Sequence, residues 1–329
     1  MKCRKLGRRL NEDLDDLLAG PHATWRYAMQ LGRRCTQSTI KAVALEERLD
    51  WKTVKDYEKL YMQEKLKLRG EINPRVIGID EISVRRGHTY RIVVSDLETK
   101  EPIWFGGKDR STDSMDEFWA WLGPEKAAKI RLCVMDMWGP FEASARKNAP
   151  QAAILYDKFH VYKHLSEAMD DVRRSEYARV AGDDRKFIKG QRYNLLKNPE
   201  NLTPEGKLEL KLLLDINKRL NKAYVLKEQF DRLWEYSYPG AARKFFDAWK
   251  GALKWQKLGP FEKFAAMVDR HWDGIVASYR RENHGIALGY VEGLNNKIRV
   301  FQRKAFGLRD EEYLRLKVLS AGLPDFYTW

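Results

Sequence analysis

The chain has 329 residues, of which 43% are hydrophobic, and its 61 Lys and Arg residues against 47 Asp and Glu residues give a net charge of +14. This composition excludes a disordered chain and indicates two or three globular domains. No apolar run approaches the roughly 20 residues of a membrane helix, so we expect a cytoplasmic protein without a membrane partner. The excess positive charge favours nucleic acid as a partner, although charge alone leaves an anionic membrane surface or the ribosome open.

The first 70 residues have the pattern of a small DNA-binding region. Residues 1–23 form a basic and then acidic N-terminal arm, for which a loose terminus is the simpler interpretation. Residues 24–70 predict an all-α helix-turn-helix domain, whose second helix would bring Lys52, Thr53 and Lys55 to the major groove of DNA. An ordinary helical hairpin is the alternative.

A segment rich in strands follows over residues 71–160. Apolar alternation and turn residues predict an antiparallel meander, then helix, strand, helix and strand, with predicted strands over 75–85, 88–97, 101–107, 129–137 and 152–161. This order is that of an RNase-H-like mixed sheet in an α/β fold. We expect residues 161–287 to be a large helical insertion, after which residues 288–329 return to the catalytic core as helices.

Three carboxylates are candidates for one metal site. Asp80 and Asp136 each end or interrupt an apolar strand, where an unpaired charge is costly, and Glu292 lies in the helical run from 291 to 299. Hard divalent cations that assist phosphodiester chemistry prefer carboxylate oxygens. Each aspartate could instead cap a turn or pair with a lysine.

The helix that carries Glu292 has further polar residues on the same predicted face. Asn295, Asn296, Arg299 and Arg303 follow the glutamate by three, four, seven and eleven positions. Adjacent asparagines are poor helix formers, so a face turned toward the DNA backbone explains them better than a solvated charged face does.

Other residues have weaker patterns. Asp157 and His160 are expected at a strand end, where they would support the catalytic carboxylates, and a separate zinc site made with His164 is the alternative. Cys3, Cys35 and Cys133 are too far apart for paired zinc ligands. Spacing places the tryptophans, Trp255 among them, mainly in the core, although one exposed in the insertion could stack on a base.

Four sequence segments, which follow one another along the chain, indicate the function more specifically. G-I-D-E-I-S-V-R-R-G-H-T-Y, V-M-D-M-W-G-P-F, L-Y-D-K-F-H-V and V-E-G-L-N-N-K-I-R-V-F-Q-R-K-A-F-G-L-R resemble the ISL3 family of bacterial insertion-sequence transposases, which are enzymes of the DDE type. The resemblance implies an RNase-H-like catalytic domain and Asp80, Asp136 and Glu292 as the catalytic triad. It also implies two Mg²⁺ or Mn²⁺ ions as cofactors, and Arg299 as a contact to DNA near the cleaved phosphate.

The reaction that the resemblance implies is cleavage of double-stranded DNA at the terminal inverted repeats of the element, followed by strand transfer into target DNA. We expect a homodimer on DNA, associated with the bacterial nucleoid. Family members usually carry a cysteine-rich zinc-binding module ahead of the helix-turn-helix, and this sequence shows none. The alternatives are therefore a shortened, catalytically idle derivative that represses by binding DNA, and a nuclease of the same fold.

Overall fold

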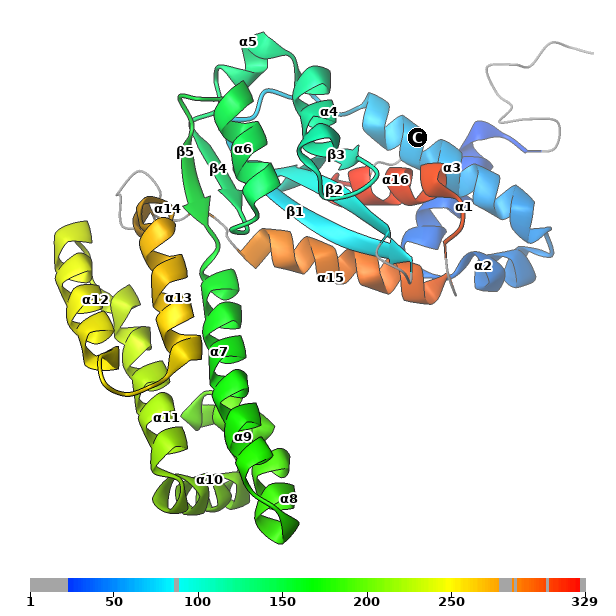
Figure 1. The fold of residues 1–329 in the computed structure, drawn as a ribbon. Coiled ribbons are helices and arrows are strands. Elements are labelled where there is room, and N and C mark those ends of the chain that lie inside the picture. The colour runs from blue at the N-terminus through cyan, green and yellow to red at the C-terminus, as the bar shows by residue number, and fades with distance from the viewer. Residues whose placement is uncertain (1–22, 86–88, 278–285, 287–288, 306–307, 326–329) are drawn as a thin grey trace, which may run out of the picture. The chain divides into compact units, whose positions relative to one another are not determined.

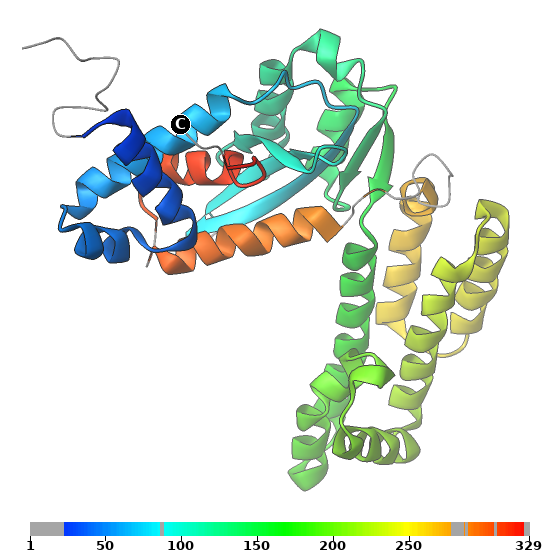
Figure 2. The ribbon, with the colours of Figure 1, turned by 180° about the vertical axis from the view of Figure 1, so that it is seen from behind.

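A computed structural model describes residues 23–85, 89–277, 286, 289–305 and 308–325. The expected arm over residues 1–23, apart from Ala23, and the end of the expected insertion lie outside the described residues. The chain forms two compact units, one from Met1–Lys129 with Gly289–Trp329 and the other from Ile130–Leu288 (Figures 1 and 2). In the described ranges, every helix is too short or too polar to cross a membrane.

The strands belong to a five-stranded mixed sheet, which confirms the predicted RNase-H-like α/β fold. In the first unit, β1 (Val76–Arg85), β2 (Thr89–Asp96) and β3 (Glu101–Gly106) form the predicted antiparallel meander in the order β3-β2-β1. In the second unit, β4 (Leu132–Met135) and β5 (Ala153–Tyr156) are parallel.

Helices cover both faces of the meander. Across the strands Ile79 pairs with Val94, which pairs with Trp104, and this row faces α4 (Thr112–Leu122), where Phe118 meets the Trp104 ring edge-on at 5.8 Å. The short α5 (Pro124–Ala127) follows. Because neighbouring strand residues point to opposite faces, Asp80 faces the other way, toward α15 (Gly289–Lys304) and α16 (Glu311–Leu319).

The contact between α15 and β1 is close. Leu294 and Ile298 of α15 are buried with Ile82 of β1 in one core. At Gly78 an added Cβ would lie 2.6 Å from Cγ2 of Val291, so only glycine lets the helix approach the strand this closely.

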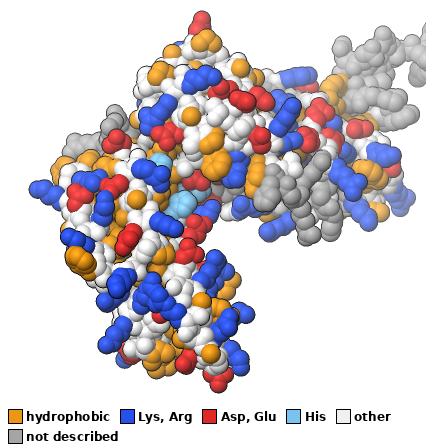
Figure 3. Space-filling view, viewed as in Figure 1, with side chains coloured by type: hydrophobic (Ala, Val, Ile, Leu, Met, Phe, Trp, Pro, Cys, Tyr) orange, Lys and Arg blue, Asp and Glu red, His pale blue; other side chains and the backbone are white. Residues whose placement is uncertain are grey.

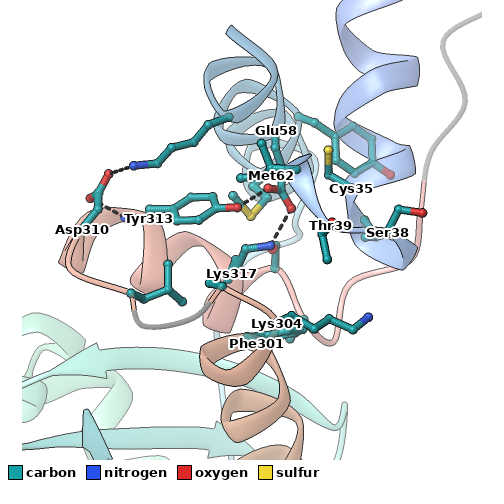
Figure 4. A pocket seen from close by; sticks show the side chains of 18 of the residues that line it. Cys35, Ser38, Thr39, Glu58, Met62, Phe301, Lys304, Asp310, Tyr313 and Lys317 are labelled. Atoms are coloured by element: carbon teal, nitrogen blue, oxygen red, sulfur yellow. Dashed lines mark hydrogen bonds and ion pairs between the residues drawn. The ribbon is translucent and has the colours of Figure 1, made fainter. Parts of the chain in front are cut away.

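Three helices form the described part of the amino-terminal segment for which a helix-turn-helix is predicted. They are α1 (Trp25–Gln37), α2 (Ile40–Glu47) and α3 (Trp51–Lys67), and the side chains of Thr24, Thr39 and Asp50 cap them. Their own apolar core includes Leu31, Val43, Val54 and Tyr61. A polar contact attaches α3 to α16: Glu58 is 1% exposed, accepts a hydrogen bond from the Tyr313 hydroxyl and lies 2.6 Å from Nζ of Lys317 (Figure 4).

This contact borders a cavity of about 1000 Å³ between the helix-turn-helix and the C-terminal helices of the same unit (Figure 4). Burial raises the pKa of the Glu58 carboxyl, and the ammonium of Lys317 opposes that rise. Lys55 Nζ reaches Asp310 Oδ2 at 2.7 Å on the same border. The helices α1 to α3 are therefore held by the buried Glu58 and the half-buried pair of Lys55 and Asp310 as well as by apolar packing.

The second unit is mainly helical. After α6 (Gly139–Asn148) and β5, the chain forms a bundle with a buried aromatic centre made by Phe230, Phe246, Trp249, Phe261 and Phe264. Its helices are α7 (Lys158–Arg179), α8 (Gly182–Gly190), α9 (Arg192–Leu196), α10 (Pro204–Ile216), α11 (Lys218–Phe230), α12 (Pro239–Leu253), α13 (Gly259–Arg270) and α14 (Trp272–Val276), with short 3-10 turns at Pro199–Asn201 and Asp231–Glu235.

The strand predicted over residues 152–161 is wrong in its second half. β5 ends at Tyr156, and α7 begins at Lys158. The Asp157 carboxylate accepts a hydrogen bond from the Phe159 N–H at 2.9 Å, so it caps the first turn of the helix.

Replacing Glu58 with Ala is expected to destabilise the protein by about 3 kcal/mol, because the largely buried ammonium of Lys317 loses its partner. Urea unfolding of the full chain, followed by circular dichroism, measures the change. Glu64→Ala is the matched control on the same helix, since its pair with the exposed Lys67 is expected to contribute less than about 1 kcal/mol. Equal losses in the two variants would contradict the role of Glu58.

Gly78→Ala is expected to cost about 1 to 3 kcal/mol of unfolding free energy, because the new methyl group presses on Val291 and strains the α15 contact. The same unfolding assay applies. Gly70→Ala, where an added Cβ meets no atom within 4 Å, is the control and should be nearly neutral. A neutral Gly78→Ala would show that the helix tolerates a larger separation from β1.

Candidate functional site

Asp80 lies in the middle of β1 and not at its end. It is half-buried, and both of its carboxylate oxygens accept hydrogen bonds. Oδ1 accepts from the N–H of Glu81 at 2.8 Å, and Oδ2 accepts from Nδ2 of Asn295 at 2.6 Å. These two hydrogen bonds hold the carboxylate of Asp80 on the sheet face that α15 covers.

Asn295 occupies a different environment from the one that the sequence indicates. The sequence predicts a side chain that faces DNA, but Asn295 is 5% exposed. The reason is its position three residues before Ile298, on the side of α15 that packs against β1. Its Oδ1 is buried and has no hydrogen-bond partner within the described residues, so an acceptor oxygen remains unused beside Asp80.

Glu292 is exposed and lies three residues before Asn295 on α15. Side chains separated by three positions on a helix are neighbours, with Cβ atoms roughly 5 to 6 Å apart. The hydrogen bond between Asn295 and Asp80 therefore places Glu292 one helical turn from the amide that touches Asp80.

The remaining polar residues of α15 lie at the surface. Asn296, Arg299 and Arg303 are all exposed, and Nη1 of Arg299 donates a hydrogen bond to Oδ1 of Asn296 at 3.1 Å. This pairing orients the guanidinium along the outer side of the helix. A planar guanidinium in that position can bind a phosphate with two hydrogen bonds.

The second unit contains Asp136 and its neighbours. Asp136 directly follows β4, as predicted, and its Oδ1 accepts a hydrogen bond from the N–H of Met137 at 2.6 Å. Its Oδ2 lies 3.7 Å from Nε2 of His160, whose Nδ1 lies 3.9 Å from Oδ2 of Asp157. The imidazole thus stands between two carboxylates, and its Nδ1 makes no hydrogen bond to the described part of the chain.

The zinc alternative has no support in this unit. His164 points to Glu167, with Nδ1 and Oε2 3.2 Å apart, and not to His160. Among the described residues, no three His, Cys, Asp or Glu side chains lie close enough to hold a metal ion by themselves. The proposed triad is divided between the units, with Asp80 and Glu292 in the first and Asp136 in the second.

The helix-turn-helix candidates differ in accessibility. Lys52 is exposed, whereas Thr53 and Lys55 are half-buried at the start of α3. Since Lys55 pairs with Asp310, the positive charge of Lys55 is partly neutralised within the protein. A contact to DNA by these three residues stays a prediction.

The contact of Asn295 with Asp80 does not follow from the sequence patterns described above. The adjacent Asn295 and Asn296 are an unusual feature of a helix, and the spacing of Asn295 with Val291 and Ile298 is the signal that could have indicated its burial. His160 lies beside Asp136, where the sequence pattern expects it, and its support of the catalytic carboxylates stays a prediction.

Known proteins show clear similarity to this chain. The sequence model of the ISL3-type DDE transposase family, described as "Transposase", matches residues 77–318, more than half of the chain. The transposase for insertion sequence element IS1001 of Bordetella parapertussis is 32% identical over 322 residues, which cover 97% of this chain and 78% of that protein. The transposase for IS1557 of Mycobacterium tuberculosis is 30% identical over 324 residues, which cover 89% and 71%. The chain therefore belongs to the ISL3 family of insertion-sequence transposases.

Proposed function

We propose that the chain cleaves double-stranded DNA at the terminal inverted repeats of its own insertion sequence and transfers the freed 3′ ends to target DNA. Asp80, Asp136 and Glu292 supply the carboxylates of the catalytic site. The observation that carries this proposal is the partly buried hydrogen bond from Asn295 to Asp80. It favours one rotation of α15, in which Glu292 lies one helical turn from the asparagine that contacts Asp80.

The donor atoms of this site suit a hard divalent cation. Carboxylate and amide oxygens are the ligands that Mg²⁺ and Mn²⁺ accept, and Oδ1 of Asn295 is a buried oxygen without a hydrogen-bond partner in the described structure. Asp80, Asp136 and Glu292 would hold the metal. When bound, two such ions activate the attacking oxygen and stabilise the leaving one.

The protein's other side chains position the reactants. Asn295 orients Asp80. Nε2 of His160 can hold the carboxylate of Asp136, and the carboxylate of Asp157 faces Nδ1 of the same imidazole. Arg299, Arg303 and Asn296 on the outer side of α15 bind phosphate groups of the DNA near the cleaved bond. Lys52 and Thr53 of α3 contact DNA away from the site and help to set its register.

The partners follow from the reaction. Transposition joins two element ends to one target, so we infer that two copies of the chain act together on DNA at the bacterial nucleoid. The positive charge of the chain favours this encounter because each neutralised phosphate releases counterions, and binding is therefore expected to weaken steeply as salt rises.

Glu292→Gln is expected to lower the rate of DNA cleavage by on the order of 100-fold or more, because the amide removes a charged metal ligand while keeping the side-chain shape. The assay is cleavage and joining, with Mg²⁺, of a duplex that carries the ends of the element encoding this chain. Asp80→Asn and Asp136→Asn should behave alike. The control is Glu312→Gln, which alters an exposed carboxylate paired with Lys59. Parent-like cleavage by Glu292→Gln would refute the triad, and binding without cleavage by the parent would favour a repressor.

Asn295→Ala is expected to lower cleavage by roughly 10- to 100-fold and to raise the Mg²⁺ concentration needed for half-maximal rate, since Asp80 loses the donor that orients it. The neighbouring Asn296→Ala is the matched control. It should weaken DNA binding and leave the Mg²⁺ dependence unchanged, because Asn296 is exposed and does not contact Asp80. The same Mg²⁺ dependence in both variants would contradict the claim that Asn295 orients Asp80 for metal binding.

A further inference from the structure

Trp255 of the second unit is exposed to an unusual degree. Its side chain is 83% accessible, in the turn L-K-W-Q-K-L that joins α12 to α13. The backbone is also unusual, because Trp255 has φ of 71° and Lys257 has φ of 54°. A bulky residue rarely adopts the left-handed conformation, and strained residues cluster at active sites and ligand clamps.

The turn is fixed to the unit at both ends. Leu253 and Leu258 are buried at 2% and 0% exposure, and the N–H of Gln256 donates to the carbonyl of Leu253 at 3.0 Å. The guanidinium of Arg219 on α11 donates to the carbonyl of Lys257 at 3.0 Å. The indole is therefore held in solvent by an ordered backbone.

The charge around the indole is positive. Nζ of Lys254 lies 5.2 Å from the centre of the Trp255 ring. Neither Lys254 nor Lys257 pairs with a carboxylate in the described part of the chain, whereas the nearby Lys250 pairs with Asp269. Figure 3 shows Lys and Arg side chains, with Asp and Glu side chains among them, over the helices of this unit on the face in view.

We propose that Trp255 stacks on an unpaired base of nucleic acid while Lys254 and Lys257 bind the adjoining phosphates. This inference rests on the proposed function, which brings DNA to the protein. An exposed aromatic face with lysines beside it in the same turn is an arrangement that suits single strands, because stacking tolerates any base and the cations follow the backbone. An apolar protein partner would gain nothing from the two unpaired lysines.

Binding of the full chain to a duplex with one unpaired 2-aminopurine tests the proposal. Stacking quenches 2-aminopurine, and a fully paired duplex of the same sequence is the reference. Trp255→Ala should reduce affinity for the unpaired probe by roughly 5- to 150-fold and abolish the quenching. Trp255→Phe should keep most of the affinity for the unpaired probe and most of the quenching. Tyr238→Ala, which removes another exposed aromatic side chain from the same unit, should change neither.

The outcomes separate this inference from the proposed function. Undiminished affinity and quenching in Trp255→Ala, together with normal cleavage of element ends by the parent, would overturn the stacking role alone. Retained affinity in Trp255→Leu would also overturn it, since leucine keeps an apolar contact but not a stacking face. Failure of the parent to cleave element ends, with intact quenching, would overturn the nuclease function and leave the base contact standing.

Discussion

The packing of α15 against β1 is the constraint on which the candidate site depends. Val291, Leu294 and Ile298 hold the helix against the sheet, but apolar packing tolerates small rotations of a helix. The hydrogen bond between Asn295 and Asp80 joins residues 215 positions apart and is directional. A rotation by one residue, about 100°, would break that bond and turn Glu292 away. The polar contact therefore sets which face of α15 meets Asp80.

The burial of Asn295 lowers stability in a way that a purely structural helix would avoid. The Oδ1 atom of Asn295 is buried without a partner in the described structure, and an unsatisfied buried acceptor typically costs about 1 to 3 kcal/mol. Within the described residues, Nδ1 of His160 also lacks a hydrogen bond; it lies 3.9 Å from Oδ2 of Asp157, while Nε2 of the same ring lies 3.7 Å from Oδ2 of Asp136. Local rules are commonly broken where function requires it. In both units the unsatisfied atom belongs to a side chain that lies against a carboxylate of the proposed triad.

Polar contacts also govern how the helix-turn-helix joins its unit. The expected domain boundary near residue 70 follows a linker in the sequence, yet α3 contacts α16 through Glu58, Tyr313 and Lys317, and Lys55 pairs with Asp310. Directional polar contacts of this kind favour one orientation of α3 on α16. Attached in this way, α3 keeps a defined position relative to Asp80 and Glu292 within the same unit.

The sequence by itself determined the elements and the family. Strand alternation in β1 to β3 and helical periodicity in α3 and α15 are local properties, and four ordered blocks of residues are specific enough to indicate the transposase family. Only the tertiary structure decided that Asn295 is buried against Asp80, that Asp157 caps a helix, and that Trp255 is exposed and not in the core. Periodicity shows that a helix or strand has a buried and an exposed face, but the partner on that face comes from a distant part of the chain. Contacts such as Asn295 with Asp80 therefore become visible only when α15 packs on β1.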